Sequence, residues 1–247
     1  MPKSRWHSMR QVKSVTRKKI VFVIVEGPSD DTALGVMFTR LYNKNLVRVE
    51  ITHGDITTRD WVRTDNIAAR IGDLVKGYAA ANHFKASDFQ EIIHIVDTDG
   101  TFIPEGAVVE DPTCQEPSYS LTEIRTNKPA SIRRRNESKS AILIRLASLK
   151  HVWKTIPYHV YFMSCNLDHV LNGKQNSSDA EKEDDAYAFA RHYRDHLLEF
   201  LVFICDSDFS VKLDYKESWE FIRQGLHSLE RHSNLGLCFE TFRLMKH

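Results

Sequence analysis

The sequence predicts an α/β fold in which a parallel β-sheet is flanked by helices, with a C-terminal helical appendage. Two apolar runs, at 20–25 and 92–96, have the length and β-branched composition of buried strands. Between and after them lie segments with the apolar period of amphipathic helices. Connections of helical length imply parallel pairing and right-handed crossovers, so the strands end at one common edge.

The composition is ordinary for a soluble globular protein. The chain has 247 residues, 42% of them hydrophobic and 27% charged, with a formal net charge of +1. No apolar stretch approaches the roughly 20 residues that cross a bilayer, and the four cysteines show no close pairing. We therefore expect a cytoplasmic protein with free thiols, no membrane span and one main domain.

Three regions are expected. Residues 1–19 form a basic N-terminal segment, which is either a solvated tail or a site for phosphates or an acidic partner. Residues 20–172 form the main α/β domain. Residues 173–247 form a C-terminal helical region, which begins with a polar linker at 173–185.

The main domain is predicted to begin with a strand at 20–25 and a helix capped by Ser29 or Asp30. A strand at 47–52, a helix at about 60–82 and a strand at 91–96 follow. Residues 101–136 show no period and contain four prolines, so they are predicted to be a long inserted loop. A helix at 138–150 and a strand at 158–163 complete the domain.

Two helices are predicted in the C-terminal region. The first is a long amphipathic helix outlined by Phe189, Tyr193, Leu197, Phe200, Leu201 and Ile204. The second is outlined by Trp219, Ile222, Leu226 and Leu229. Neither carries a catalytic signature.

Acidic residues follow the predicted strands at the point where each strand ends. Glu26 follows the first apolar run, Asp97 and Asp99 follow the second, and Asp168 comes soon after the last strand. The carboxyl ends of parallel strands line up, so these side chains are expected to meet. Clustered carboxylates repel one another unless a cation binds, and hard divalent cations prefer oxygen ligands.

These residues carry a family resemblance. Glu26-Gly27-x-x-Asp30 together with Asp97-x-Asp99 resembles the TOPRIM domain of topoisomerases, primases and related nucleases, over about residues 18–172. The resemblance implies that Glu26 is an acid–base group or metal ligand and that Asp97 and Asp99 hold Mg²⁺. Asp30 matches the aspartate of the first motif. Asp168 resembles an extra acidic position of the overcoming-lysogenization-defect nucleases, which use two ions.

The resemblance also implies a function. The chain is similar to free-standing TOPRIM effectors of phage-defence systems, such as the effector partner of the ATPase in the PARIS system. It is therefore expected to be a Mg²⁺-dependent endonuclease with one or two ions, for which Mn²⁺ can substitute. RNA, and tRNA in particular, is the favoured substrate over DNA. A toxic role in abortive infection, control by a regulatory ATPase and an active homodimer are implied in the same way.

A basic stretch is the candidate nucleic-acid contact. Arg133, Arg134, Arg135 and Lys139 lie where the inserted loop is expected to return to the catalytic edge, and one of them could neutralise transition-state charge. The alternative is a solvated charged face. His192 and His196 have a spacing that can hold zinc, but solvated helix histidines are the favoured interpretation.

Other function classes remain open. A DNA endonuclease of the same family differs only in substrate, and a non-catalytic TOPRIM module would bind nucleic acid or scaffold a complex. A third alternative is a haloacid-dehalogenase-like phosphatase with Asp97 as nucleophile. Its later motifs would fall at the residues Ser164, Lys174, Asp206 and Asp208. That interpretation leaves the Glu26 motif unexplained.

Overall fold

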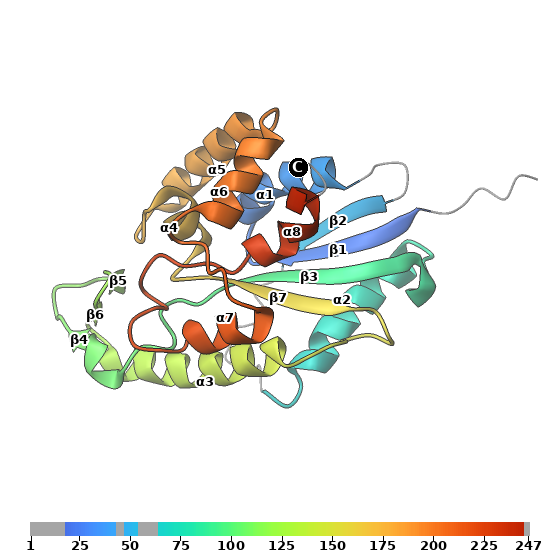
Figure 1. The fold of residues 1–247 in the computed structure, drawn as a ribbon. Helices are drawn as coiled ribbons and strands as arrows, with labels where there is room; N and C mark the ends of the chain where they lie inside the picture. Colours follow the sequence, from blue (N-terminus) through green and yellow to red (C-terminus); the bar gives the residue numbers. More distant parts are fainter. Residues whose placement is uncertain (1–17, 43–46, 54–63, 245–247) are drawn as a thin grey trace, which may run out of the picture.

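A four-stranded parallel sheet forms the centre of the protein (Figure 1). The computed structural model describes residues 18–42, 47–53 and 64–244, so residues 1–17 of the predicted basic segment 1–19 lie outside the described residues. The strand order is β2-β1-β3-β7, in which β1 spans Lys19–Val25, β2 Val47–His53, β3 Phe89–Asp97 and β7 Tyr158–Met163. The neighbouring strands pair in parallel. The predicted α/β class with a parallel sheet flanked by helices is confirmed.

Helices cover both faces of the sheet (Figure 1). Alternate residues of β1 belong to two different cores: Val21, Val23 and Val25 to one, and Ile20, Phe22 and Ile24 to the other. This follows from the two-residue period of a strand and explains why the run is apolar throughout. The sheet is thus the middle layer of three.

One face is covered by helices from both ends of the chain. These are α1 (Pro28–Leu41), α4 (Leu167–Asn172), α5 (Asp179–Tyr193), α6 (Leu197–Asp206) and α8 (Gly236–Leu244). Their buried side chains share one core with β1, β3 and β7, and Phe200 and Phe239 are fully buried in it. The C-terminal helices therefore contribute directly to the core that supports the sheet.

The other face is covered by three helices. They are α2 (Ile67–Ala81), α3 (Pro129–Ala147) and α7 (Tyr215–Phe221). Their apolar residues meet the second face of the sheet, with the Phe162 and Trp219 rings 5.2 Å apart. Helix α2 was expected from about residue 60, and the stretch 54–63 lies outside the described residues.

The start of α1 corrects the predicted cap. Gly27 is the residue before the helix and Pro28 is its first residue, so neither Ser29 nor Asp30 is the N-cap. Instead the Asp30 carboxylate accepts a hydrogen bond from the Gly27 nitrogen at 2.9 Å. Proline suits this position because the first nitrogens of a helix have no intrahelical partner.

The stretch 101–136 is not one irregular loop. It holds one short 3-10 helix, η2 (Glu105–Ala107), followed by three short strands: β4 (Val108–Glu110), β5 (Ser118–Tyr119) and β6 (Ile124–Thr126). The three strands form a small sheet in the order β4-β6-β5. Helix α3 already begins at Pro129 and ends at Ala147, whereas 138–150 was predicted. Its first turns are basic and carry few apolar residues, which hid the helical period.

The C-terminal region also departs from the prediction. Helix α5 begins inside the predicted linker, where the Ser178 and Glu181 side chains form a capping box. The predicted long helix is two helices, α5 and α6, with a break at 194–196. Helix α7 ends at Phe221 and does not extend to Leu226 and Leu229, which pack on the small sheet beside Ile124. Helix α8 was not predicted.

Within the part of the chain that the structure describes, no helix is both long enough and apolar enough to cross a membrane.

A short 3-10 helix, η1 (Ala86–Asp88), leads into β3.

Candidate functional site

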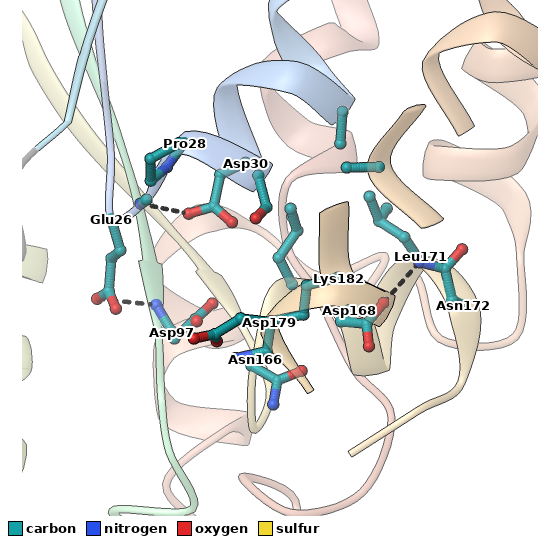
Figure 2. A pocket seen from close by; sticks show the side chains of 15 residues that line it. Glu26, Pro28, Asp30, Asp97, Asn166, Asp168, Leu171, Asn172, Asp179 and Lys182 are labelled. Atoms are coloured by element: carbon teal, nitrogen blue, oxygen red, sulfur yellow. Dashed lines mark hydrogen bonds between the residues drawn. The ribbon is translucent and has the colours of Figure 1, made fainter. Parts of the chain in front are cut away.

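Glu26 and Asp97 are joined at the carboxyl edge of the sheet. Their strands, β1 and β3, are parallel neighbours, so both residues lie at the same edge. The Glu26 Oε1 atom accepts a hydrogen bond from the Asp97 backbone nitrogen at 3.2 Å (Figure 2). The two strand ends therefore meet as predicted, although 70 residues lie between Glu26 and Asp97 in the sequence.

A pocket of about 310 Å³ opens at this edge. Four of the predicted site residues line it: Glu26, Asp30, Asp97 and Asp168. Asp179 and Lys182 of α5 also line it (Figure 2). Asp99 is not among the lining residues, but it remains close to the others, because one lysine, Lys139, pairs with both Asp99 and Glu26.

The environment of Asp97 opposes its ionisation. Burial raises the pKa of this carboxyl well above its usual range, and the nearby carboxylates of Glu26, Asp30 and Asp99 raise it further. The positive charge of Lys139 acts in the opposite direction but does not outweigh them. A cation placed in the pocket beside Asp97 would favour the charged form.

Asp99 faces a different environment on the side of α3. Its Oδ2 atom accepts a hydrogen bond from Lys139 Nζ at 2.5 Å, and its backbone oxygen accepts one from Arg135 at 2.7 Å. Burial alone would raise the pKa of Asp99, but Lys139 and Arg135 outweigh it and lower that pKa. Asp99 is therefore held as a carboxylate by cations of the chain itself.

Lys139 is buried between two acidic residues. Its side chain is 1% exposed, and its Nζ atom lies 3.7 Å from Glu26 Oε1 as well as 2.5 Å from Asp99 Oδ2. Burial would lower the pKa of Lys139, but Asp99 and Glu26 outweigh that effect and raise it. This lysine was expected on a nucleic-acid contact surface, and the structure places it inside the site instead.

The carboxylates of this site suit Mg²⁺ only if the ion keeps several of its water ligands. Among the described residues, no three His, Cys, Asp or Glu side chains are placed to hold one ion together. Mg²⁺, however, commonly keeps several waters and uses one or two carboxylates. Glu26 and Asp97, with hard oxygen atoms at the rim of a pocket, fit that requirement. An ion enclosed by Glu26, Asp97 and Asp99 together does not fit this arrangement.

The two outlying acidic residues are engaged in local hydrogen bonds. Asp30 accepts from the Gly27 nitrogen, as described for the start of α1. Asp168 accepts from the Asn172 side-chain amide at 2.7 Å and from the Ser177 hydroxyl. These bonds fix the start of α1 and the turn after α4, and both residues still border the pocket.

The basic residues of α3 do not form one patch. Arg135 is partly buried and donates to the Tyr119 hydroxyl at 2.6 Å and to the Asn136 side chain. Arg133 is exposed and donates to the Val108 oxygen at 3.0 Å. Arg134 is exposed. Only Arg133 and Arg134 therefore keep the accessibility expected of residues that contact a nucleic acid.

The remaining predicted positions lie away from the pocket. Its lining includes none of the residues Ser164, Lys174, Asp206 and Asp208 that a phosphatase site would need. Lys174 instead pairs with Asp185 at 2.6 Å. His192 and His196 are exposed, with ring centroids 5.8 Å apart, and no third ligand joins them within the described residues.

Sequence reasoning missed a support for the site that comes from the C-terminal region. The Ser228 backbone oxygen accepts from the Thr98 hydroxyl at 3.0 Å and from the Cys165 nitrogen at 2.9 Å. His232 and Ser164 exchange hydrogen bonds in the same way. These contacts fix the turns after β3 and β7, and no local pattern announces them. The capping box at Ser178 could have revealed α5, and with it Lys182.

The fold and the pocket define the class of this protein: an α/β protein with an acidic pocket at the carboxyl edge of a parallel sheet. Comparison with models of protein families, with curated proteins and with solved structures gave no match to this chain.

Proposed function

We propose that this protein is a Mg²⁺-dependent endonuclease of the TOPRIM class, which hydrolyses phosphodiester bonds in nucleic acid. The observation that carries the proposal is the junction of Glu26 and Asp97 at one sheet edge, where they border a pocket. Carboxylates in that position suit an ion that binds phosphate oxygens. The matched spacing of both motifs supports the TOPRIM assignment.

Each site residue has a distinct proposed role. Glu26 and Asp97 would hold the ion together with water, and Glu26 would also act as the general base. When bound, the ion supplies polarisation of the phosphoryl oxygen and a more acidic water. Lys182, which also lines the pocket, would contact a substrate phosphate. Arg133 and Arg134 offer exposed charge for the backbone of a longer nucleic acid.

The biological role rests on the resemblance to phage-defence effectors. By that resemblance the substrate is RNA, with tRNA favoured, and cleavage arrests growth in abortive infection. An ATPase partner would restrain the protein, and a homodimer would be its active form. DNA is the alternative substrate, and the same assay distinguishes the two.

A second candidate function is a non-catalytic module that binds nucleic acid or scaffolds a complex. The observation that favours it is the pairing of Asp99 with Lys139, which already neutralises a residue expected to bind metal. This alternative predicts nucleic-acid binding that persists when Mg²⁺ is chelated.

The decisive experiment incubates the purified full chain with total RNA and with plasmid DNA, each with Mg²⁺ or with EDTA. Cleavage with Mg²⁺ that disappears with EDTA is the expected result. The Glu26→Gln protein should not cleave, because it loses the charge while keeping a side chain of the same shape. Glu240→Gln is the matched control, since Glu240 is exposed on α8.

The outcomes separate the candidates. Cleavage by Glu26→Gln at the wild-type rate would refute the catalytic assignment. Magnesium-independent binding without any cleavage would favour the non-catalytic module. Release of inorganic phosphate from small esters, dependent on Asp97 but not on Glu26, would favour the phosphatase.

A further inference from the structure

We infer that Lys139 takes the place of one of two metal ions, so that the site binds a single divalent cation beside Glu26 and Asp97. This inference rests on the proposed function, since it concerns the ion that the function requires. It decides between the one-ion and the two-ion site, which the sequence left open.

The Lys139 ammonium group lies between two acidic side chains of the site. It lies 2.5 Å from Asp99 Oδ2 and 3.7 Å from Glu26 Oε1, between carboxylates that the TOPRIM resemblance assigns to metal binding. A cation that binds between Glu26 and Asp99 would have to lie beside this ammonium. Two cations at that spacing repel each other, so the ammonium and an ion exclude one another there.

Lys139 is held in a fixed place by the packing of α3. It lies on the buried face of α3 together with Asn136, Ile142 and Leu143. Its side chain is 1% exposed, and a buried charge is retained only where an opposite charge faces it. If the ammonium moved away from Asp99 and Glu26, the charges of Lys139, Asp99 and Glu26 would all lose this pairing.

The backbone conformation of Asp99 directs this residue toward α3. Its φ angle is +48°, and its nitrogen donates to the Cys165 oxygen at 2.8 Å. Arg135 donates to its backbone oxygen, and Arg135 is itself held by Tyr119 and Asn136. Several contacts therefore fix the conformation in which Asp99 meets Lys139 and does not border the pocket.

Glu26 and Asp97 border the pocket together with Asp30, whereas Asp99 and its partner Lys139 do not line it. A single ion that binds from the pocket would therefore meet Glu26 and Asp97 and not the paired Asp99. Lys139 then serves as the fixed positive charge on the other side.

The test counts Mn²⁺ ions bound by the purified full chain, by isothermal titration and by the electron paramagnetic resonance signal of free Mn²⁺. The wild-type protein should bind one ion per chain. Lys139→Met, which keeps the length of the side chain without the charge, should bind two. Lys139→Arg should still bind one. Two ions in the wild-type protein, or one in a folded Lys139→Met protein, would overturn the inference.

A pair of isosteric variants gives an independent answer if Lys139→Met fails to fold. Asp97→Asn should weaken Mn²⁺ binding at least about tenfold, as expected for a ligand. Asp99→Asn should change it by less than about threefold, since Asp99 is paired with Lys139 and is not a ligand of the ion in this arrangement. Equal losses in the two variants would contradict the inference.

Failure of the inference is distinguishable from failure of the proposed function. One Mn²⁺ ion bound by a protein that cleaves no nucleic acid would refute the function and leave the ion count standing. Two ions bound by an active nuclease would refute only the inference.

Discussion

The Glu26 side chain at the end of β1 is bonded to the Asp97 backbone at the end of β3. The acceptor is Glu26 Oε1 and the donor is the Asp97 nitrogen, 3.2 Å away. This bond ties two strand ends together at the point where the pocket opens. Glu26 therefore has a structural role as well as the proposed chemical one, and the two roles can be separated by substitution.

Glu26→Gln and Glu26→Ala should differ in stability but not in metal binding. Glutamine keeps an oxygen that can accept from the Asp97 nitrogen, whereas alanine leaves that nitrogen without this acceptor, at a cost of about 1 kcal/mol or more. Both variants lose a proposed ligand. Thermal unfolding and Mn²⁺ titration measure the two effects, and equal destabilisation by both substitutions would show that the bond contributes nothing.

Lys139→Met should lower the free energy of unfolding by about 3–5 kcal/mol, because it leaves buried carboxylates without their cation. The double variant Lys139→Met/Asp99→Asn should recover part of the loss. Urea unfolding of the single and double variants gives the coupling directly. Strictly additive losses would contradict a functional ion pair.

The cost of Lys139→Met should also depend on pH. The pKa of Asp99 is lowered in the folded protein, so its pairing stabilises the fold above the usual aspartate range. That stabilisation is lost as the pH falls through the lowered pKa. The gap between wild type and variant should therefore narrow in acid and be widest near neutrality.

Asp97→Asn should stabilise the metal-free protein at neutral pH. The pKa of Asp97 is raised in the folded state, so folding favours the protonated form, and that contribution is lost as the pH rises through the raised pKa. Asparagine has no charge to lose. Unfolding in EDTA at neutral and acidic pH should show the advantage of the variant disappearing in acid; an advantage that grows in acid would contradict it.

His94 should make the fold sensitive to acid. It is fully buried in β3, and burial lowers its pKa from 6.5 to about 3. Between pH 6.5 and about pH 3 the unfolded chain binds a proton that the folded chain does not. The free energy of unfolding therefore falls by up to about 1.4 kcal/mol for each unit by which the pH decreases. His94→Gln, which keeps a partner for the Tyr158 hydroxyl, should reduce this slope of unfolding free energy against pH. An unchanged slope would mean that other groups cause it.

Thr98 should act as a positioning residue for the Asp97–Asp99 turn. Its buried hydroxyl donates to the Ser228 oxygen at 3.0 Å and accepts from the Cys165 nitrogen at 2.9 Å. Thr98→Val keeps the shape but removes both bonds, at a cost of about 1–3 kcal/mol. It should also weaken Mn²⁺ binding, and Thr98→Ser should restore both properties. Weak binding in the serine variant would instead indicate that packing of the methyl group matters.

The sheet and the meeting of its acidic ends could be predicted because both depend on local patterns. The run before Glu26 and the run before Asp97 have strand character, and parallel pairing brings their ends together. The position of Lys139 could not be predicted in the same way. A lysine in a basic stretch is usually solvated, and only the packing of α3 against the sheet makes this one buried.

Long-range polar contacts were equally hidden. Ser228 and Thr98 are 130 positions apart and bond through a backbone oxygen, which any residue type could supply. The separation of Asp99 from the pocket depends on Lys139 and Arg135 together, and so on the placement of a whole helix. Short motifs identify the residues that share an edge, but they do not indicate which way each side chain turns.

The hydrogen bonds from Ser228 and His232 also have a consequence for protein synthesis. They fix the turns after β3 and β7, yet they come from residues 228–232, far beyond both strands in the sequence. A nascent polypeptide still holding that segment inside the ribosome lacks these partners. The turns that border the acidic pocket therefore gain these partners only after residues 228–232 have emerged.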